Sequence, residues 1–409
     1  MELKPNGRYS PRLIHAPTEL QAGRILARIG VDPHGIRAML PKMRSLLIAL
    51  DDVECRVANI LKQEMLASGG DAAVHRESVA CTNPSTDVLI MGTPKQIRRL
   101  AAKLAVQPFG LSGLSRSLIE ILENSECTDY LLRTGHREMT VGKTTAVMGI
   151  LNVTPDSFSD GGQFPTVDAA VQYGYRMAEE GADFIDVGGE SSRPGADPVP
   201  ADVELARILP VIEALHACVE VPVSVDTTKA EIARHALAAG AEIVNDISAM
   251  TYDPAMPAVV AESGAAVVLM HMRGLPKTMQ ATLSEYRSLP GDIVLYLKER
   301  LEAAQTSGIG FDRIIVDPGF GFGKSLGDNL ALLNGLAELR MLGRPILAGV
   351  SRKSFVRQIT GETLSASSEG TAAAIAAAAM NGAAIVRVHN VPAARKVVSM
   401  IDALKEART

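Results

Sequence analysis

The chain has 409 residues, which is long for one domain and suits two, since a domain takes roughly 100–200 residues. It carries 41 Lys and Arg against 46 Asp and Glu, a formal charge of −5 that gives no support for a nucleic-acid binder. The four cysteines lie far apart, no apolar leader follows the first methionine, and no apolar stretch reaches the roughly 20 residues of a membrane span. We therefore expect a cytoplasmic protein without a disulfide framework, and neither nucleic acid nor membrane as a partner.

Residues 1–126 predict a small separate α/β domain. Thr18–Gln21 has the form of a capping box and precedes an apolar-periodic stretch that ends near Ile29. Further strands and helices are expected, in chain order, at 46–50 (strand), 53–67 (helix), 87–91 (strand), 94–106 (helix) and 112–122 (helix). This part of the chain contains no chemical motif, and the basic side chains Arg98, Arg99 and Lys103 are more simply explained as a solvated helix face.

From residue 145 onward the chain repeats one unit: a short apolar run, a turn with Gly or Asp, and a helical pattern. The runs are continuously apolar rather than alternating, which is typical of parallel strands covered on both faces. The expected strands are 147–151, 184–187, 221–225, 242–244, 266–270, 313–316, 345–348 and 384–388. The clearest helical patterns between them are 168–180, 202–218, 229–239, 292–306 and 327–339.

Eight such units over residues 145–409 favour a (β/α)8 TIM barrel, a fold of about 250 residues. A doubly wound open sheet also alternates strands and helices, but it concentrates its binding site at one switch point. Here polar clusters follow nearly all the strands, which favours the barrel. We thus predict an α/β chain, with a TIM barrel after the small N-terminal domain. Residues 127–144 would be a linker that can form a hairpin at the bottom of the barrel.

In a barrel the carboxyl ends of all eight strands meet on one face, where catalytic residues lie. Asp226, Asn245 and Asp317 follow three of the strands and offer acceptors and an amide to a flat, hydrogen-bonding heterocycle. The last two strands lead into Ser351–Arg352–Lys353 and Arg387–Val388–His389, and this is where barrels commonly bind phosphate. Taken singly, each residue has a simpler explanation, because an Asp after a strand is more often a helix cap. Taken together, they predict a polar, anionic substrate.

Eight motifs in chain order resemble those of the dihydropteroate synthases. They are MGILNVTPDSFSDGG (148–162), GGESSRPGA (188–196), SVDTTK (224–229), VNDI (244–247), MHMRGLPKTMQ (270–280), DPGFGFGK (317–324), GVSRKSF (349–355) and RVH (387–389). The resemblance covers about two-thirds of the chain. It implies a TIM-barrel enzyme that condenses 6-hydroxymethyl-7,8-dihydropterin diphosphate with p-aminobenzoate, giving 7,8-dihydropteroate and pyrophosphate. The N-terminal domain lies outside the family's common core, and its role is left open.

The resemblance also implies roles for individual residues. On the pterin ring it places Asp226, Asn245, Ile247, Met270, Asp317, Phe322, Gly349 and Lys353. On the diphosphate it places Asn152, Arg387 and His389, with Asn152 also a ligand of Mg²⁺. On the p-aminobenzoate side it places Ser192, Arg193 and Ser351. The catalytic set would be Asp226, Asp317, Lys353, Arg387 and His389.

The sequence departs from the family pattern at two positions. Ser192 stands where Thr is usual and keeps the hydroxyl, while Asn390 stands where Asp is usual and is expected to alter the support of His389. The resemblance further implies a homodimer through the last helices. Two alternatives stay open: a pterin-dependent methyltransferase with a corrinoid protein partner, and a non-catalytic pterin-binding regulator.

Overall fold

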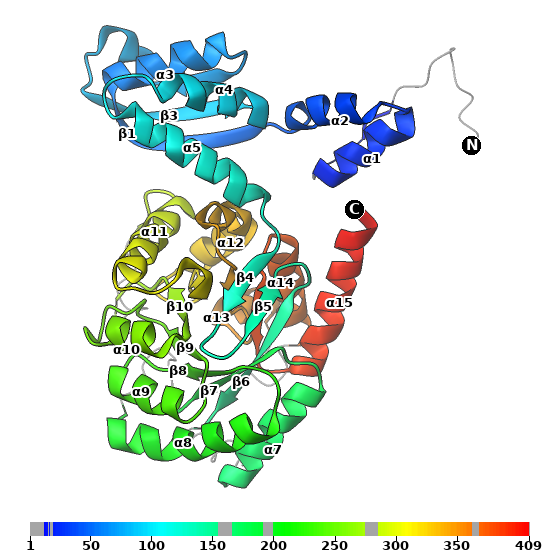
Figure 1. Cartoon of the computed structure of the whole chain (residues 1–409), viewed down its shortest axis with the longest axis vertical. Coiled ribbons are helices and arrows are strands. Elements are labelled where there is room, and N and C mark those ends of the chain that lie inside the picture. Colours follow the sequence, from blue (N-terminus) through cyan, green and yellow to red (C-terminus); the bar gives the residue numbers. More distant parts are fainter. Residues whose placement is uncertain are drawn as a thin grey trace. The chain divides into compact units, whose positions relative to one another are not determined.

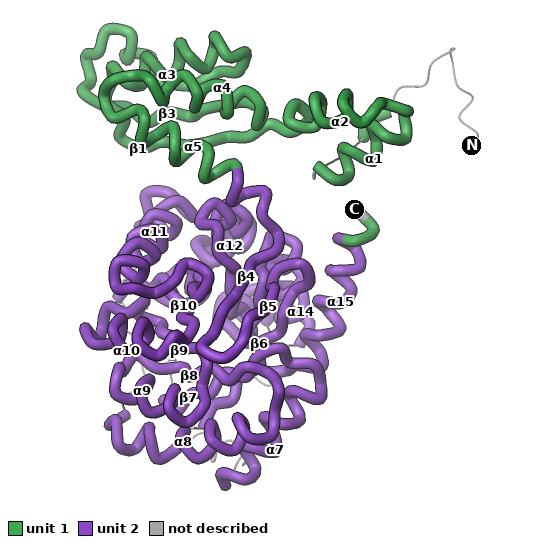
Figure 2. The backbone as a smooth tube through the Cα atoms, in the orientation of Figure 1, with its two compact units in different colours: residues 1–122, 406–409 green, residues 123–405 purple. Residues whose placement is uncertain are grey.

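The computed structural model describes residues 12–14, 16, 19–153, 166–190, 199–274, 285–361 and 368–408. The chain divides into two units (Figure 2), the first made of residues 1–122 and 406–409 and the second of residues 123–405. Each unit has a hydrophobic core of its own. In the described part of the chain, no helix combines the length and the apolar character needed to cross a lipid bilayer.

The first unit is built on an antiparallel sheet in the order β1–β3–β2. Apolar residues of the sheet, among them Ile48 and Ile90, pack against helix residues such as Leu61 and Leu100. The elements are α1 (Glu19–Ile29), α2 (Pro33–Met39), η1 (Leu40–Lys42), β1 (Leu46–Glu54), α3 (Cys55–Ala67), β2 (Asp71–Val74), η2 (Arg76–Ala80), β3 (Ser85–Gly92), α4 (Pro94–Leu104) and α5 (Leu111–Glu126). Strand β2 was not expected, because three of its four residues are Asp and Ala, which are depleted in strands. Thr18 of the expected capping box lies outside the described residues.

The second unit contains a sheet of parallel strands in the order β11–β10–β9–β8–β7–β6–β13–β12. A parallel bridge between Val316 and Ile346 joins the two ends of this order and closes the sheet into a barrel. The strands are β6 (Ala146–Asn152), β7 (Phe184–Gly188), β8 (Val223–Asp226), β9 (Ile243–Asp246), β10 (Ala266–Met270), β11 (Ile314–Asp317), β12 (Leu347–Ala348) and β13 (Ile385–Val388). The expected TIM barrel is confirmed, and its strands lie within two residues of the expected positions.

Helices surround the barrel (Figure 1) and follow the strands in the chain. They are α7 (Val167–Glu179), α8 (Ala201–Cys218), α9 (Ala230–Ala238), α10 (Met256–Ser263), α11 (Gly291–Thr306), α12 (Leu326–Asn334), α13 (Ser354–Thr360), α14 (Glu369–Met380) and α15 (Val391–Arg408), with the short 3-10 helices η3 (Phe311–Arg313) and η4 (Leu336–Leu342). The single helix expected over 327–339 is wrong, because α12 ends before Gly335 and the chain continues as η4.

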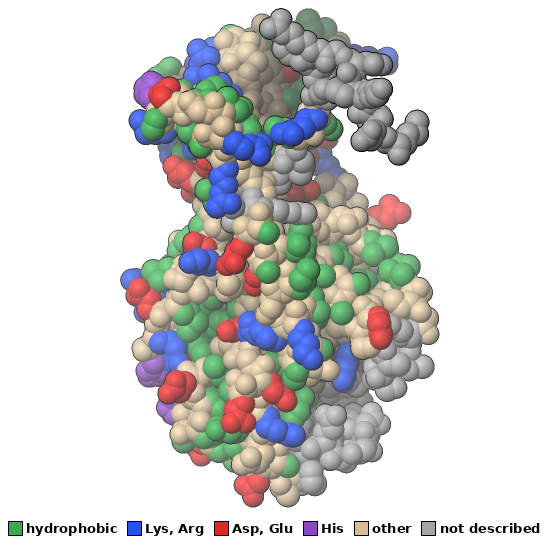
Figure 3. Space-filling model, turned by 90° about the vertical axis from the view of Figure 1, so that its right-hand side faces the viewer, with side chains coloured by type: hydrophobic (Ala, Val, Ile, Leu, Met, Phe, Trp, Pro, Cys, Tyr) green, Lys and Arg blue, Asp and Glu red, His purple; other side chains and the backbone are tan. Residues whose placement is uncertain are grey.

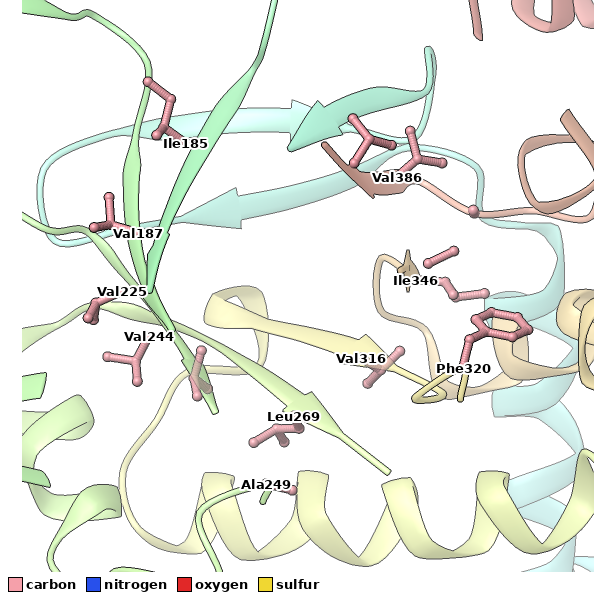
Figure 4. Packing of buried hydrophobic residues seen from close by; sticks show 14 of the residues in the cluster. Ile185, Val187, Val225, Val244, Ala249, Leu269, Val316, Phe320, Ile346 and Val386 are labelled. Atoms are coloured by element: carbon pink, nitrogen blue, oxygen red, sulfur yellow. The ribbon is translucent and has the colours of Figure 1, made fainter. Parts of the chain in front are cut away.

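Side chains that alternate along each strand form two apolar layers. One set, including Val187, Val225 and Leu269, belongs to the core between the strands and the helices (Figure 4). The other set, including Met148 and Ile315, forms a separate cluster at the amino ends of the strands. This cluster also contains Tyr130, Leu132 and Val141 from the antiparallel hairpin of β4 (Tyr130–Arg133) and β5 (Glu138–Val141). The hairpin therefore covers the apolar floor of the barrel and leaves the carboxyl ends open for the site.

On the face drawn in Figure 3, Lys and Arg side chains are interspersed with Asp and Glu among the described residues of the barrel unit. The Ala-rich helix α14 buries Ala374, Ile375, Ala378 and Ala379. Most of these residues belong to the core of the barrel, so one face of α14 packs on its own chain.

Candidate active site

A pocket with both polar and apolar lining residues lies at the carboxyl ends of the barrel strands. All eight residues expected on the pterin ring line it: Asp226, Asn245, Ile247, Met270, Asp317, Phe322, Gly349 and Lys353. Gly319, Phe320 and Arg387 complete the lining. The pocket thus collects side chains from strands that are far apart in the sequence.

The period of two along each strand explains why polar side chains reach this pocket. In β9, Val244 packs under the helices while the next residue, Asn245, lines the pocket. In β11, Val316 likewise packs under the helices, and the next residue, Asp317, lines the pocket. Strand ends that carry a polar residue at the inward position therefore build a polar ring above the apolar floor.

Arg387 connects two carboxylates inside the barrel. Its Nε donates to Oδ2 of Asp186 at 2.6 Å, and its Nη2 donates to Oδ2 of Asp226 at 2.7 Å. The same Oδ2 of Asp186 accepts a hydrogen bond from Nδ2 of Asn245 at 2.9 Å. Asp186 is completely buried. Its carboxylate therefore holds in place both Arg387, which is expected to bind the diphosphate, and Asn245, which is expected to bind the pterin.

The two pocket carboxyls have raised pKa values. Burial raises the pKa of Asp226 to about 7, against the opposing effect of Arg387 and with a further increase from the Asp186 charge. Burial raises the pKa of Asp317 to about 6, although the backbone N–H of Gly319 donates to its Oδ1 at 2.7 Å. Near neutral pH, both groups can therefore change charge when a ligand binds.

One wall of the pocket is apolar and carries a cation above it. Ile247, Met270 and Phe322 form a small buried cluster. Nζ of Lys353 lies 4.1 Å from the centre of the Phe322 ring, within the range of a cation–π interaction. Burial lowers the pKa of Lys353 to about 8. A flat ring placed here would meet an apolar face and hydrogen-bonding groups at its edge.

The structure describes Asn152, Ser351, Arg387 and His389 among the residues expected on the diphosphate and p-aminobenzoate sides. Nδ1 of His389 lies 3.1 Å from Oγ of Ser351, so the ends of two adjacent strands are linked. Asn152 is the last residue of β6 and pairs in register with Gly188, which in turn pairs with Asp226. Ser192 and Arg193 lie outside the described residues.

Lys229 connects the residues on either side of the segment 191–198. Its Nζ lies 2.5 Å from Oε2 of Glu190 and 2.7 Å from the backbone oxygen of Val199. A third contact, at 2.6 Å, is with Oε2 of Glu204, whose side chain is almost fully buried. Lys229 therefore links Glu190, Val199 and Glu204 to one another.

Asn390, which stands where Asp is usual in the family, caps a helix. Its Oδ1 accepts a hydrogen bond from the backbone N–H of Ala393 at 3.1 Å, which caps the first turn of α15. Asn390 therefore lies at the start of helix α15, and its expected effect on His389 stays a prediction.

Sequence reasoning missed two buried residues of the site, Asp186 and Lys324. Asp186 lies inside strand β7 at an inward position, so the alternation of that strand could have identified it. Lys324 closes the motif DPGFGFGK and is 2% exposed, but no sequence pattern distinguishes a buried lysine from a solvated one.

Among the described residues, no group of three or more His, Cys, Asp and Glu side chains is arranged to hold a metal ion. The expected Mg²⁺ ligand, Asn152, offers one amide oxygen at the rim of the barrel. Mg²⁺ is commonly held by one or two protein oxygens together with substrate phosphates, and a single amide at the end of β6 fits that pattern.

Comparison with known proteins identifies the family. The pterin binding enzyme family matches residues 148–389. A dihydropteroate synthase of Synechocystis sp. is 44% identical over 283 residues, which cover 68% of this chain and 98% of that protein. A solved structure of the Xanthomonas albilineans dihydropteroate synthase with 4-aminobenzoic acid is 46% identical, has a TM-score of 0.63, and is covered over 99% of its length by 68% of this chain.

A third relative also matches the N-terminal part of the chain. A probable bifunctional folylpolyglutamate synthase/dihydropteroate synthase of Halobacterium salinarum is 42% identical over 383 residues, which cover 93% of this chain. The match spans only 45% of that longer protein. The family model, the relatives and the pocket all point the same way, and the chain belongs to the pterin binding enzymes and, among them, to the dihydropteroate synthases.

Proposed function

We propose that this site condenses 6-hydroxymethyl-7,8-dihydropterin diphosphate with p-aminobenzoate to form 7,8-dihydropteroate and pyrophosphate. The observation that carries the proposal is one pocket in which two carboxyls, a carboxamide and an apolar wall face an arginine at the strand end where barrels bind phosphate. A pterin fits the first set of groups, and a diphosphate on its methylene carbon fits the arginine.

Recognition of the pterin would use the edge and the faces of the ring. Asp226 and Asp317 would accept N–H groups of the ring, and the amide of Asn245 would complete the edge. Ile247, Met270 and Phe322 would pack on the faces. Lys353 would donate to ring heteroatoms, because its ammonium lies over Phe322 on the same wall.

The reaction breaks the bond between the methylene carbon and the diphosphate oxygen, and the electron pair leaves with pyrophosphate. The positive charge that develops on the methylene carbon is delocalised into the electron-rich pterin. Ionised Asp226 and Asp317 stabilise this charge, and Arg387 and His389 stabilise the departing anion. The amine of p-aminobenzoate then forms the new C–N bond and releases a proton to solvent, so no strong dedicated base is required.

Asn152 would hold Mg²⁺ together with the diphosphate oxygens. When bound there, the ion would add charge stabilisation for the leaving group. Arg387 lies on the same side of the pocket, where it is already paired with Asp186. Ser351 would help to line the p-aminobenzoate side, next to His389.

We also propose a homodimer that uses the outer face of α15. Met400 and Leu404 are four residues apart on this helix and are 61% and 39% exposed, although both are large and apolar. Sedimentation of the protein and of a Met400→Glu variant tests this, with a dimer expected for the first and a monomer for the second.

Cytoplasmic localisation stays a prediction.

The activity is tested by incubating the purified protein with the pterin diphosphate, p-aminobenzoate and Mg²⁺, and by measuring pyrophosphate and dihydropteroate. Pyrophosphate release that depends on p-aminobenzoate is expected. Pterin binding without release would indicate the non-catalytic regulator. Methyl transfer to a corrinoid protein, without pyrophosphate release, would indicate the methyltransferase.

A further inference from the structure

A buried lysine that the reaction does not use lies under the pocket. Lys324 follows the glycine-rich segment after β11 and is 2% exposed. Its Nζ lies 2.8 Å from the backbone oxygen of Gly319, 3.0 Å from Nδ1 of His271 and 3.2 Å from the backbone oxygen of Phe322. A fourth, longer contact of 3.4 Å is with the backbone oxygen of His271. Burial lowers the pKa of Lys324 to about 7, so the ammonium form prevails below that pH, and its three N–H donors all have acceptors here.

His271 is built to accept this hydrogen bond rather than to titrate. It is 3% exposed, and its ring packs edge-on against Tyr296, with centroids 4.9 Å apart. Burial, assisted by the Lys324 charge, lowers the pKa of His271 to about 2. Its ring is therefore neutral, and Nδ1 is available as the acceptor for Lys324.

The lysine connects two backbone segments that lie unusually close. Gly319 and Gly323 have φ of +70° and +63°, and a Cβ on either would collide with a backbone oxygen, that of His271 or that of Arg273. The segment after β11 therefore lies directly on the end of β10. Lys324 ties the two together, because it binds His271 on one side and Gly319 and Phe322 on the other.

The segment that Lys324 holds carries two pterin-facing groups. The N–H of Gly319 orients Asp317, and Phe322 forms the apolar wall. The charged groups that act on the Asp317 carboxyl are Lys353, Arg387 and Lys324, and each favours its ionised form. A change at Lys324 thus reaches the pterin pocket through both geometry and charge.

We propose that Lys324 is a positioning residue of the pterin site, which fixes the segment from Asp317 to Phe322 against the end of β10. The inference rests on the function proposed above. It assigns Lys324 no contact with either substrate.

The test compares the unaltered protein with Lys324→Met, which keeps the length of the side chain and removes its charge. We expect KM for the pterin diphosphate to rise by about tenfold to a hundredfold, with a much smaller change in KM for p-aminobenzoate. The lower part of the acid limb of kcat/KM for the pterin diphosphate, where Asp317 titrates with a pKa of about 6, should move to higher pH, because loss of a nearby positive charge raises the pKa of Asp317. A merely structural defect would lower activity without moving this limb.

Lys298→Met is the matched control, since Lys298 is an exposed lysine on α11, away from the pocket. Calorimetric binding of the pterin diphosphate adds a readout that does not depend on turnover. An unchanged pterin KM and an unchanged acid limb in Lys324→Met, beside a normally active unaltered protein, overturn this inference alone. Failure of the unaltered protein to bind the pterin diphosphate overturns the proposed function, and this inference with it.

If Lys324→Met does not fold, His271→Asn provides the second variant, because it keeps the lysine charge and alters one of its acceptors. The pterin KM should then rise, while the acid limb stays in place. An unchanged pterin KM in a folded His271→Asn protein overturns the positioning role.

Discussion

Arg387 and Asp226 form an ion pair across the interior of the barrel, between strands that are not neighbours. Nη2 of Arg387 on β13 lies 2.7 Å from Oδ2 of Asp226 on β8, and two strands, β6 and β7, separate them in the sheet. Without ligands, Arg387, which we propose binds the diphosphate, and Asp226, which we propose binds the pterin, therefore neutralise each other. A substrate that carries both a pterin and a diphosphate supplies new partners to both.

The first prediction concerns Arg387→Ala. The change removes leaving-group stabilisation, and pyrophosphate release should fall to background. It also leaves the buried Asp186 and Asp226 without their cation, so unfolding in denaturant should show a loss of about 3 kcal/mol, the lower end for a broken buried ion pair. Arg395→Ala is the control, because Arg395 pairs with the half-exposed Asp183 outside the pocket. Turnover retained in Arg387→Ala would contradict the role proposed for this arginine.

A second prediction concerns Asp186→Asn. The amide is the same size as the carboxylate but is neutral, and it replaces the group that holds both Arg387 and Asn245. We expect KM for the pterin diphosphate to rise about tenfold, the usual consequence of a lost charge-assisted hydrogen bond. Steady-state kinetics with each substrate varied in turn provide the measurement. Asp183→Asn should leave KM unchanged, and equal KM values in both variants would show that the buried carboxylate does not position Arg387.

The raised pKa values also predict how stability depends on pH without ligands. Asp226 has a pKa of about 7 in the fold, against an ordinary value of 3.8, so the folded state binds more protons between these limits. The contribution of Asp226 to stability is therefore fully present below about pH 4 and is lost as the pH rises through about 7. Asp317, with a pKa of about 6, acts in the same direction.

Asp226→Asn should remove this penalty, at the cost of activity. Above pH 7 the ligand-free variant should melt at a higher temperature than the unaltered protein, by an amount worth at most about 4 kcal/mol, since each pKa unit corresponds to about 1.4 kcal/mol. Thermal unfolding at several pH values provides the measurement. The difference should vanish near pH 4, where the aspartate is neutral in the folded protein, and a difference independent of pH would contradict the assignment.

The barrel could be predicted from the sequence because each strand is an apolar run buried on both faces. The errors occur where local signals were weak. The helix expected over 327–339 is interrupted at Gly335, where a glycine and a 3-10 turn replace the helical pattern. Strand β2 has only four residues, Asp71–Val74, and depends on its pairing with β3 rather than on its own composition.

The site was predictable to a similar extent and for a similar reason. Residues at strand ends, such as Asn245 and Asp317, must face the mouth of a barrel, so position alone identified them. The ion pair of Arg387 with Asp226 depends on distances across the barrel, which no sequence spacing gives. Lys324 was missed because its burial follows from the close packing of two loops.

Three glycines in the second unit should respond differently to alanine. Gly349→Ala places a methyl group where nothing lies within 4 Å, so stability should stay unchanged, but the methyl group enters the pterin pocket and should raise the pterin KM. The methyl group of Gly319→Ala would collide with the backbone oxygen of His271, and the positive φ adds strain. Stability should therefore fall and the pterin KM should rise. Gly327→Ala on α12 meets only Oγ of Ser325 at 3.9 Å and serves as the control. Thermal unfolding and the pterin KM are measured on all three variants. A fall in stability reports a collision within the fold, whereas a rise in KM alone reports a methyl group in the pocket. Unchanged pterin binding in Gly349→Ala would show that the ring does not approach this glycine.

The last prediction separates the two units. Removal of residues 1–122 should leave an active enzyme, because the barrel has its own core and the Xanthomonas albilineans structure is covered over 99% of its length by 68% of this chain. Removal of residues 1–144 should abolish folding, because it also deletes the hairpin. Tyr130, Leu132 and Val141 would no longer cover the apolar floor, and the buried Glu242 would lose its hydrogen bond from Thr134 and its ion pair with Arg137. Circular dichroism and pyrophosphate release distinguish the two truncations. A folded but inactive 123–409 protein would mean that the N-terminal unit contributes to catalysis, which the pocket residues give no reason to expect.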